Sequence, residues 1–373
     1  MAFIIAIHPD DYTAAGKPPG SDASSGRWSQ HLEERGHKVK WVDVRRADSL
    51  EQVKGCHGFM WRWAHFGGMG RIARRLLPVI ENELKIPVYP DQHTCWHYDD
   101  KIAQAYLFKA LDIATPATWI WFDRSQAETW ASQAKYPLVL KLAIGAGSFN
   151  VRLVRDAQEA RLWIERLFSH RIENLAEDQF AKLSLYRRLR RSAGIMLKGR
   201  PPSFGDSGFE FNTGYVLFQE FLAGNIYDTR VTVIGNRAFA YRRFNRPADF
   251  RASGSGLVDY DPAKIDEGFI RLAFSAAKKL RAQSCAIDGL YRGKECVLGE
   301  VSYTYISAYV NSCPGHWDLD GDPQTGQLTW VSGSMWPEEA QVADFIAKVR
   351  RECTGDGTPG QLQSSTSLPP KCE

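Results

Sequence analysis

Two lysines and two carboxylates occupy defined points of the strand and helix patterns in the middle of this 373-residue chain. Lys101 lies in a predicted helix over 99–111, and Lys141 ends the apolar strand YPLVLK directly before the glycine-rich turn IGAGSFNV. Asp288 and Glu300 follow on two short β segments, AIDGL and LGEVSY, which a turn at Gly293 joins. Each of these pieces is a weak signal alone, but their order along the chain is more specific.

These residue types are the ones that a nucleoside triphosphate requires. Ammonium groups and backbone N–H groups bind phosphates, and carboxylates bind the accompanying Mg²⁺. Gly145 and Gly147 permit positive φ and close approach to a ligand, and Ser148 stands in the same turn. A short glycine turn has low specificity by itself, so an ordinary hairpin with a surface lysine is the alternative.

Composition places the chain among ordinary globular proteins and narrows the choice of partners. The hydrophobic fraction is 44% and the charged fraction 24%, and the net charge of +4 gives no argument for nucleic acid. No stretch reaches the roughly 18 apolar residues of a membrane span. The seven cysteines are scattered without paired spacing, which favours a reducing, cytoplasmic compartment.

Strand and helix signals divide the chain into five parts. Strands alternate with helices through the first ninety residues, which predicts a parallel, doubly wound, Rossmann-like sheet. A strand–helix–strand–turn–strand–helix unit follows, and the pattern becomes rich in β-strands from Tyr215 onward. The predicted parts are a substrate domain (1–90), a small lobe with the glycine-rich loop (91–168), a basic insert (169–211), a large lobe with the metal site (212–352) and a disordered tail (353–373).

The basic insert has two interpretations. It carries several arginines, among them Arg187, Arg188 and Arg190, and it ends in a Pro/Gly-rich stretch. Runs of charge are usually solvated faces, which is the simpler interpretation. A basic flap that meets an anionic substrate is the other.

Asp288 and Glu300 are candidate metal ligands. On adjacent antiparallel strands, two carboxylates can face each other across the pair, and without a cation they would repel. Mg²⁺ resolves that conflict, since it takes one or two protein carboxylates together with phosphate oxygens. Arg230, Arg243 and Arg251 lie between the candidate nucleotide and metal residues, and arginine recognises carboxylate or phosphate with two hydrogen bonds.

With these residues in view, the chain resembles the ATP-grasp superfamily. The similarity extends over roughly residues 90–310 through DDKIAQAYLFKALDIATPAT, YPLVLKLAIGAGSFNV, FQEFLAGNIYDTRVTVIG, AIDGL and GEVSY. The branch with the ribosomal-protein glutamate ligase and the glutathione synthetases is the most similar one. The resemblance implies two α+β lobes that clamp ATP, after a Rossmann-like pre-grasp domain.

The resemblance also implies a role for individual residues. Lys101 and Lys141 look like the phosphate-contacting lysines, and Asp228 resembles the ribose or metal-side acid. Four hinge residues would bind adenine: Gln219, Glu220, Phe221 and Leu222. Three arginines, Arg230, Arg243 and Arg251, would steady the transferred group, and Asp288 and Glu300 would bind Mg²⁺ or Mn²⁺. Ser302 stands where the superfamily usually has asparagine, which is a stronger metal ligand.

The activity that this resemblance implies is ADP-forming ligation of a carboxylate to an amine through an acyl phosphate. A uronic acid of a glycan, in polysaccharide biosynthesis, and an amino acid or small peptide are the expected carboxylate substrates. Ser302 and the basic insert favour an alternative, a nucleotide-binding module without ligase activity, and phosphotransfer to a hydroxyl is a third hypothesis. Members of the superfamily are often oligomeric, so a homodimer is one expectation.

Overall fold

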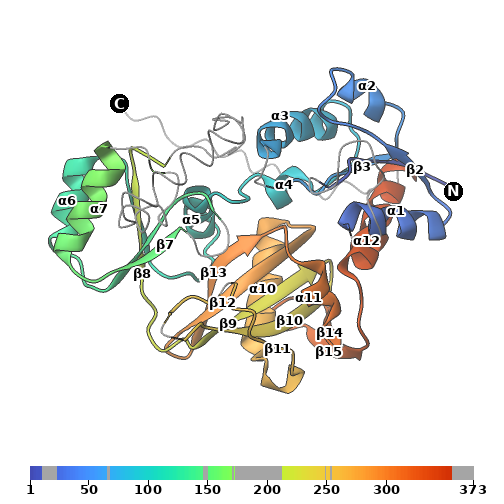
Figure 1. Ribbon diagram of the computed structural model, residues 1–373. Helices are drawn as coiled ribbons and strands as arrows, with labels where there is room; N and C mark the ends of the chain where they lie inside the picture. The colour runs from blue at the N-terminus through green and yellow to red at the C-terminus, as the bar shows by residue number, and fades with distance from the viewer. Residues whose placement is uncertain are drawn as a thin grey trace, which may run out of the picture.

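The computed structural model describes residues 1–10, 23–64, 68–145, 150–169, 172, 212–247, 249–252 and 254–354. Three β-sheets with their flanking helices form three regions of the molecule (Figure 1). Gly147, Ser148, most of the 169–211 insert and the tail after Thr354 lie outside the described residues. The expectations for these segments therefore stay predictions.

The N-terminal unit contains a four-stranded sheet in the order β2-β1-β3-β4, and each neighbouring pair is parallel, as predicted. Both faces of this sheet are covered, since Ala6 and Phe59 join one core and Ile5 and Met60 another. Its elements are β1 (Ile4–Ile7), α1 (Ser24–Glu34), β2 (Lys38–Trp41), α2 (Ser49–Val53), β3 (Gly58–Met60), α3 (Met69–Asn82) and β4 (Val88–Tyr89).

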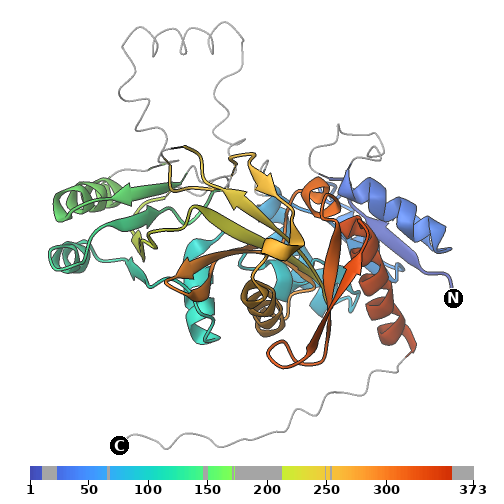
Figure 2. The same ribbon diagram turned by 90° about the horizontal axis from the view of Figure 1, so that it is seen from below.

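The C-terminal helix α12 (Pro337–Thr354) packs on this N-terminal unit and also contacts the large lobe, to which the sequence analysis assigned it. Figure 2 shows α12 beside α1. Trp28 Nε1 donates a 2.7 Å hydrogen bond to Gln341 Oε1, and the Phe345 ring fills the space where Gly58 has no side chain. The N-terminal unit therefore includes residues from both ends of the described chain. A division of the chain into contiguous domains cannot show this contact.

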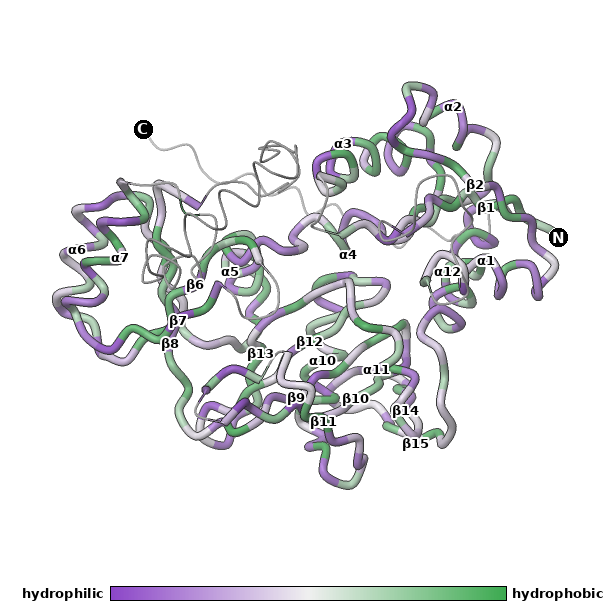
Figure 3. The backbone as a smooth tube through the Cα atoms, viewed as in Figure 1, coloured by the Kyte–Doolittle hydropathy of each residue, from purple (hydrophilic) through white to green (hydrophobic). Residues whose placement is uncertain are grey.

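The small lobe is an antiparallel sheet in the order β5-β8-β6-β7, covered on one face by two helices. Strand β8 lies between β5 and β6, so it belongs to this lobe and not to the large lobe that was predicted to begin at residue 212. Helices α6 and α7 carry both hydrophilic and hydrophobic residues (Figure 3), and α7 buries Trp163 and Leu167. The elements are β5 (Thr118–Trp121), α6 (Arg124–Ala131), β6 (Leu138–Lys141), β7 (Val151–Val154), α7 (Ala157–Ser169) and β8 (Val216–Glu220).

The large lobe is a sheet in the order β13-β12-β9-β10-β14-β15, with β11 paired to β10. Helix α10 covers one face through Phe269, Ile270 and Phe274, which leaves the opposite face of β9, β12 and β13 toward the small lobe. The elements are β9 (Tyr227–Ile234), β10 (Arg237–Phe244), β11 (Val258–Asp259), η1 (Pro262–Lys264), α10 (Glu267–Leu280), β12 (Ser284–Arg292), β13 (Glu295–Ser302), α11 (Ser307–Asn311), β14 (Gly315–Asp320) and β15 (Gln327–Ser332).

Helices α4 (Gln92–Cys95) and α5 (Lys101–Ala110) connect the N-terminal unit to the small lobe. Helix α5 begins at Asp100, whose carboxylate accepts hydrogen bonds from the N–H groups of Ile102 and Ala103. In the part of the chain that the structure describes, no helix has the length and apolar character needed to cross a lipid bilayer.

Candidate nucleotide-binding site

A cleft of about 160 Å³ lies between the small and large lobes. We call its small-lobe side the roof, formed by β6, β7 and the turn at Gly145, and its large-lobe side the floor, formed by β9, β10, β12 and β13. Val139, Lys141 and Val151 line the cleft from the roof, and Asp288, Leu290 and Glu300 line it from the floor. The predicted hinge residues Gln219, Glu220, Phe221 and Leu222 line it as well.

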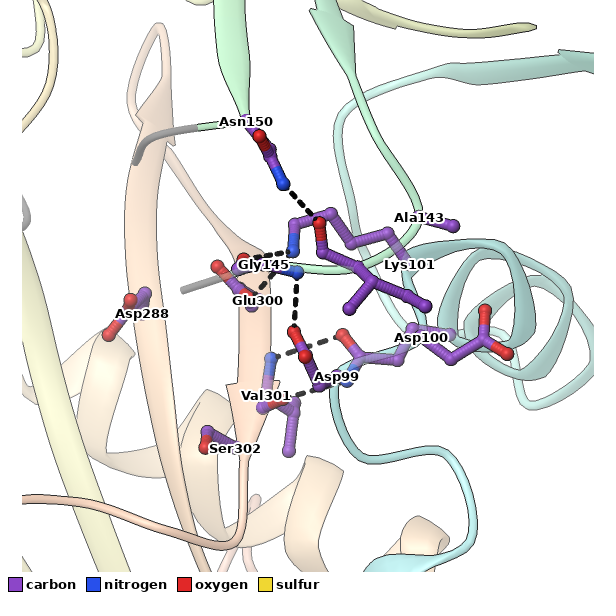
Figure 4. A network of polar contacts seen from close by, with 12 residues as sticks. Asp99, Asp100, Lys101, Ala143, Gly145, Asn150, Asp288, Glu300, Val301 and Ser302 are labelled. Carbon is purple, nitrogen blue, oxygen red and sulfur yellow. Dashed lines mark hydrogen bonds and ion pairs between the residues drawn. The ribbon is translucent and has the colours of Figure 1, made fainter. Parts of the chain in front are cut away.

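Three hydrogen bonds fix the roof to the beginning of α5 (Figure 4). Lys101 N donates to Ala143 O, Gly145 N donates to Asp99 Oδ1, and Lys101 Nζ donates to Gly145 O, each over 2.9 Å. Gly145 has a φ of 128°, and a Cβ there would lie 2.3 Å from Asn150 Nδ2. Glycine is therefore required at this position both by backbone conformation and by space.

Both predicted phosphate lysines reach the same carboxylate. Lys101 Nζ lies 3.4 Å from Glu300 Oε1, and the Lys101 side chain is 8% exposed. Burial lowers the pKa of Lys141 to about 8, while the nearby Glu300 carboxylate opposes this shift. The structure thus brings Lys101, Lys141 and Glu300 together although they come from three separate parts of the chain.

A β-bulge directs Glu300 into the cleft. Asp288 pairs with Glu300 across β12 and β13, but the next pair is Gly289 with Leu298, so Gly299 is an extra residue on β13. Leu298 packs in the core beneath α10, whereas Glu300 lines the cleft. On a regular strand, residues i and i+2 point to the same face of the sheet. The bulge at Gly299 instead places Leu298 and Glu300 on opposite faces.

Two arginines hold Asp288. Arg230 Nε lies 2.7 Å from Asp288 Oδ1 and Arg230 Nη2 lies 2.8 Å from Oδ2, and Arg243 Nη2 approaches Oδ2 at 2.8 Å. Burial alone would raise the pKa of Asp288, but the two guanidinium groups outweigh it and hold that pKa below its ordinary value. Arg230 and Arg243, two of the three arginines that the sequence analysis singled out, therefore converge on one carboxylate.

Asp228 and Arg251 each bind an oppositely charged side chain of the protein. Asp228 accepts hydrogen bonds of 2.7 and 2.6 Å from Arg243 Nε and Nη2, and it is 8% exposed. Its carboxylate therefore holds Arg243, and because Asp228 also lines the cleft, its role toward a ribose or a metal stays a prediction. Arg251 lines the cleft, and its guanidinium binds the Asp249 carboxylate at 2.7–3.0 Å.

Part of the predicted hinge already forms hydrogen bonds with the segment before β5. Glu220 N donates to Ala117 O over 2.8 Å, and the Glu220 carboxylate accepts from Ala117 N over 3.1 Å. The N–H group and one carboxylate oxygen of Glu220 are thus used within the protein, while Glu220 still lines the cleft, and its role in binding adenine stays a prediction. Phe221 packs edge-to-face on Phe250, and both rings border the cleft.

The donor set fits Mg²⁺ in part. A carboxylate has about four lone-pair directions, and guanidinium nitrogens take three of those on Asp288, so at most one remains for a cation. Glu300, whose side chain is 40% exposed, faces the cleft with Lys101 beside it. The Ser302 hydroxyl donates to Thr304 O over 2.7 Å and accepts from Thr304 N, so it is used within its own turn. Glu300 with one oxygen of Asp288 is therefore the pair that would hold Mg²⁺.

Sequence reasoning missed the residues that support the roof. Asp99 accepts from Gly145 N, Asn150 Nδ2 donates to Ile144 O, and Tyr215 Oη accepts from Ala143 N over 2.7 Å. Asp99 has a φ of 54°, a conformation in which Asp is one of the few common residues. The Asp99-Asp100 pair before a helix was a visible signal, but only one of the two acts as the cap.

No protein-family model matches this sequence, and no curated protein matches it significantly. Solved structures do match. D-alanine–D-alanine ligase from Bacillus anthracis complexed with ATP superimposes with a TM-score of 0.54 at 12% identity, over 96% of this chain and 100% of that one. The ATP-grasp ligase PsnB complexed with minimal precursor, Mg and ADP gives 0.52 at 14% identity, over 93% and 98%.

A third match is the ADP complex of N5-carboxyaminoimidazole ribonucleotide synthetase, with a TM-score of 0.52 at 12% identity over 86% of this chain and 74% of that one. At such identities the likeness is one of fold. This chain has the ATP-grasp fold, which confirms the fold that the resemblance implied.

Proposed function

We propose that this protein is an ATP-dependent, ADP-forming ligase that joins a carboxylate to an amine. One observation carries the proposal: Lys141 from the roof and two carboxylates from the floor line one cleft between the lobes of an ATP-grasp fold, and Lys101 pairs with one of these carboxylates, Glu300. The solved ATP-grasp structures similar to this chain include complexes with ATP, and with Mg and ADP. Their identities are low, so the reaction assigned to this chain is our inference from the site.

In the proposed reaction, a substrate carboxylate oxygen attacks the γ-phosphorus of ATP and the bond to ADP breaks. The amine nitrogen then attacks the acyl carbon, the carbon–oxygen bond to phosphate breaks, and the amine loses a proton as the amide forms. Such catalysis rests on positioning and on stabilising charge. Mg²⁺, when bound, would offset phosphate charge at Glu300 and Asp288.

The chain's own residues divide this work. Lys101 and Lys141 would neutralise phosphate oxygens, and the turn at Gly145 would close over them and exclude water. Arg251, at the edge of the cleft, would hold the anionic intermediate. Arg230 and Arg243 would act through Asp288, by fixing its position and charge.

The test is release of ADP in the presence of Mg²⁺ from paired panels of carboxylates and amines, including uronic acids, amino acids and short peptides. We expect Lys141→Ala to lower ADP release by about 10²–10³-fold, the usual effect of losing one group that stabilises the transition state. Lys135→Ala, at an exposed lysine of the same lobe, is the matched control. Full turnover by Lys141→Ala would contradict the proposal.

A second candidate function is a nucleotide-binding module without ligase activity. The commitment of Ser302 to Thr304 and of Asp288 to two arginines favours it, since both reduce the capacity for metal. Binding of a non-hydrolysable ATP analogue by calorimetry, with no ADP release across the panels, would select this alternative. A stable phosphorylated product in mass spectrometry would instead indicate transfer to a hydroxyl.

A further inference from the structure

A second cavity, of about 440 Å³, adjoins the nucleotide cleft. We call it the side chamber, and its walls are α5, the segment 112–119 and strand β13 at Gly299 and Glu300. Strand β13 is the edge of the large-lobe sheet, so the cleft lies over β12 and the side chamber continues past that edge. The two cavities share Lys141, Gln219, Gly299 and Glu300 as wall residues.

One face of α5 is turned to this chamber. Its lining positions are Lys101, Gln104, Ala105, Phe108 and Lys109, and their spacing of three or four residues marks a single helical face. The small side chain of Ala105 leaves the centre of that face open. Gly299 and Glu300 of strand β13 form the opposite wall.

A strap between the lobes closes the chamber from outside. Leu298 N donates to Ala114 O and Glu220 N donates to Ala117 O, each over 2.8 Å, so the segment 114–117 is bonded to both lobes. Arg292 Nη1 adds a 3.3 Å hydrogen bond to Thr115 O. An occupant of the chamber would therefore touch the connection between the lobes as well as the wall that it shares with the cleft.

The lining predicts the chemistry of the occupant. Phe108, Ile113 and Leu217 give apolar surface, and the chamber also has four cationic wall residues, Lys101, Lys109, Lys141 and Arg292. Lys101 pairs with Glu300 and Arg292 with Glu295, so Lys109 and Lys141 supply the positive charge for an anion. The volume lies in the range of about 300–1,000 Å³ that is usual for small-molecule sites. This combination suits a compact organic anion with an apolar body.

We propose that the side chamber is a second ligand site, which takes a small organic anion with an apolar body and thereby weakens nucleotide binding in the neighbouring cleft. The chamber ligand would weaken nucleotide binding because both anions interact with the positive charge of Lys141, which lines both cavities. In addition, two anions on either side of the shared wall repel each other. The coupling between two sites is reciprocal, so a nucleotide must weaken the anion by the same factor.

The probe for the first experiment is 1-anilinonaphthalene-8-sulfonate, an aromatic anion that fluoresces when it leaves water. Ala105→Leu fills the centre of the chamber, and Ala110→Leu, at an exposed position of the same helix, is the matched control. We expect Ala105→Leu to weaken probe binding by at least about tenfold and Ala110→Leu to leave it unchanged. Equal affinity in the two variants would overturn the proposal.

A charge reversal gives a second measurement that does not depend on core packing. Lys109 is exposed and lines the chamber. Lys135 is also exposed, but it lies in the small lobe and does not line the chamber. We expect Lys109→Glu to weaken the probe about threefold to tenfold, whereas Lys135→Glu has no effect. The same result from both reversals would mean that the probe senses only overall charge, against the proposal.

The third experiment titrates a non-hydrolysable ATP analogue with and without saturating probe. We expect each ligand to weaken the other by the same factor, of roughly fivefold, with both bound at saturation. Complete displacement of the probe by the analogue would place the probe in the cleft and overturn the proposal. A chain that binds no analogue would count against the nucleotide function, and the comparison of Ala105→Leu with Ala110→Leu would still decide on the chamber.

Discussion

The roof and the floor of the cleft are held in place by different means. The floor is fixed by buried side-chain charge: Arg243 contacts both Asp228 and Asp288, and its side chain is 7% exposed. The roof is held by single hydrogen bonds to backbone groups, at Ala143 and Gly145. The difference predicts that the floor is more strongly fixed than the turn at Gly145 in the roof.

The largest effect should come from breaking the floor. Arg243→Met leaves the carboxylates of Asp228 and Asp288 buried with fewer partners, so we expect the free energy of unfolding to fall by about 3–5 kcal/mol. Denaturant unfolding followed by fluorescence measures this change. As a control, Arg124→Met removes an exposed arginine that pairs with Glu128, and exposed ion pairs contribute little to stability. Equal losses in the two variants would show that the floor is not the more strongly fixed region.

Gly145→Ala tests the roof. The alanine Cβ would need space occupied by Asn150 Nδ2 and a φ of 128°, so we expect about 1–3 kcal/mol of destabilisation and weaker binding of an ATP analogue. Gly36→Ala is the matched control, because Gly36 also has a positive φ but no neighbour within 4 Å of a Cβ. Calorimetric titration and thermal unfolding of both variants separate the contact with Asn150 from backbone strain.

Asp99→Ala should loosen the roof without disturbing the floor. The change removes the acceptor for Gly145 N and places alanine at a φ of 54°, which together cost about 1–2 kcal/mol. Asp99→Asn keeps an oxygen acceptor and tolerates this φ. We expect faster hydrogen exchange at the Gly145 amide in Asp99→Ala only. Unchanged exchange would mean that Lys101 alone holds this turn.

The smallest expected effect is a dependence on pH. Burial lowers the pKa of Lys141 to about 8, so the free protein loses this proton as the pH rises through that value. Phosphate binds the protonated lysine, and the association constant of an ATP analogue should fall by about tenfold between about pH 7 and about pH 9. Lys141→Met should bind more weakly and show no such fall. A parallel decline in this variant would assign the titration to another group.

Residues with a local signal were predictable, and residues with a distant partner were not. The apolar run before Lys141, the glycines after it and the short acidic strands were visible in the sequence, and they carried the resemblance that implied the two lobes. The resemblance made Asp228 a ribose or metal-side acid, but it could not show that the partner of Asp228 is Arg243, which lies on the next strand in register with it. Strand β8 was placed in the wrong lobe because pairing between β5 and β6 leaves no mark in its own sequence.

The sequence by itself determined the class of fold and the chemical groups available to the cleft. Periodicity, turns and residue type are local properties, and they are sufficient for the parallel N-terminal sheet and for the two lysines and two carboxylates. Only the tertiary structure decided which acidic and basic side chains form ion pairs. The Asp288–Arg230 pair depends on the register of β12 with β9, and the direction of Glu300 depends on one extra residue at Gly299. Register and bulges are set by contacts between distant strands, because a slip of one residue turns each side chain to the other face.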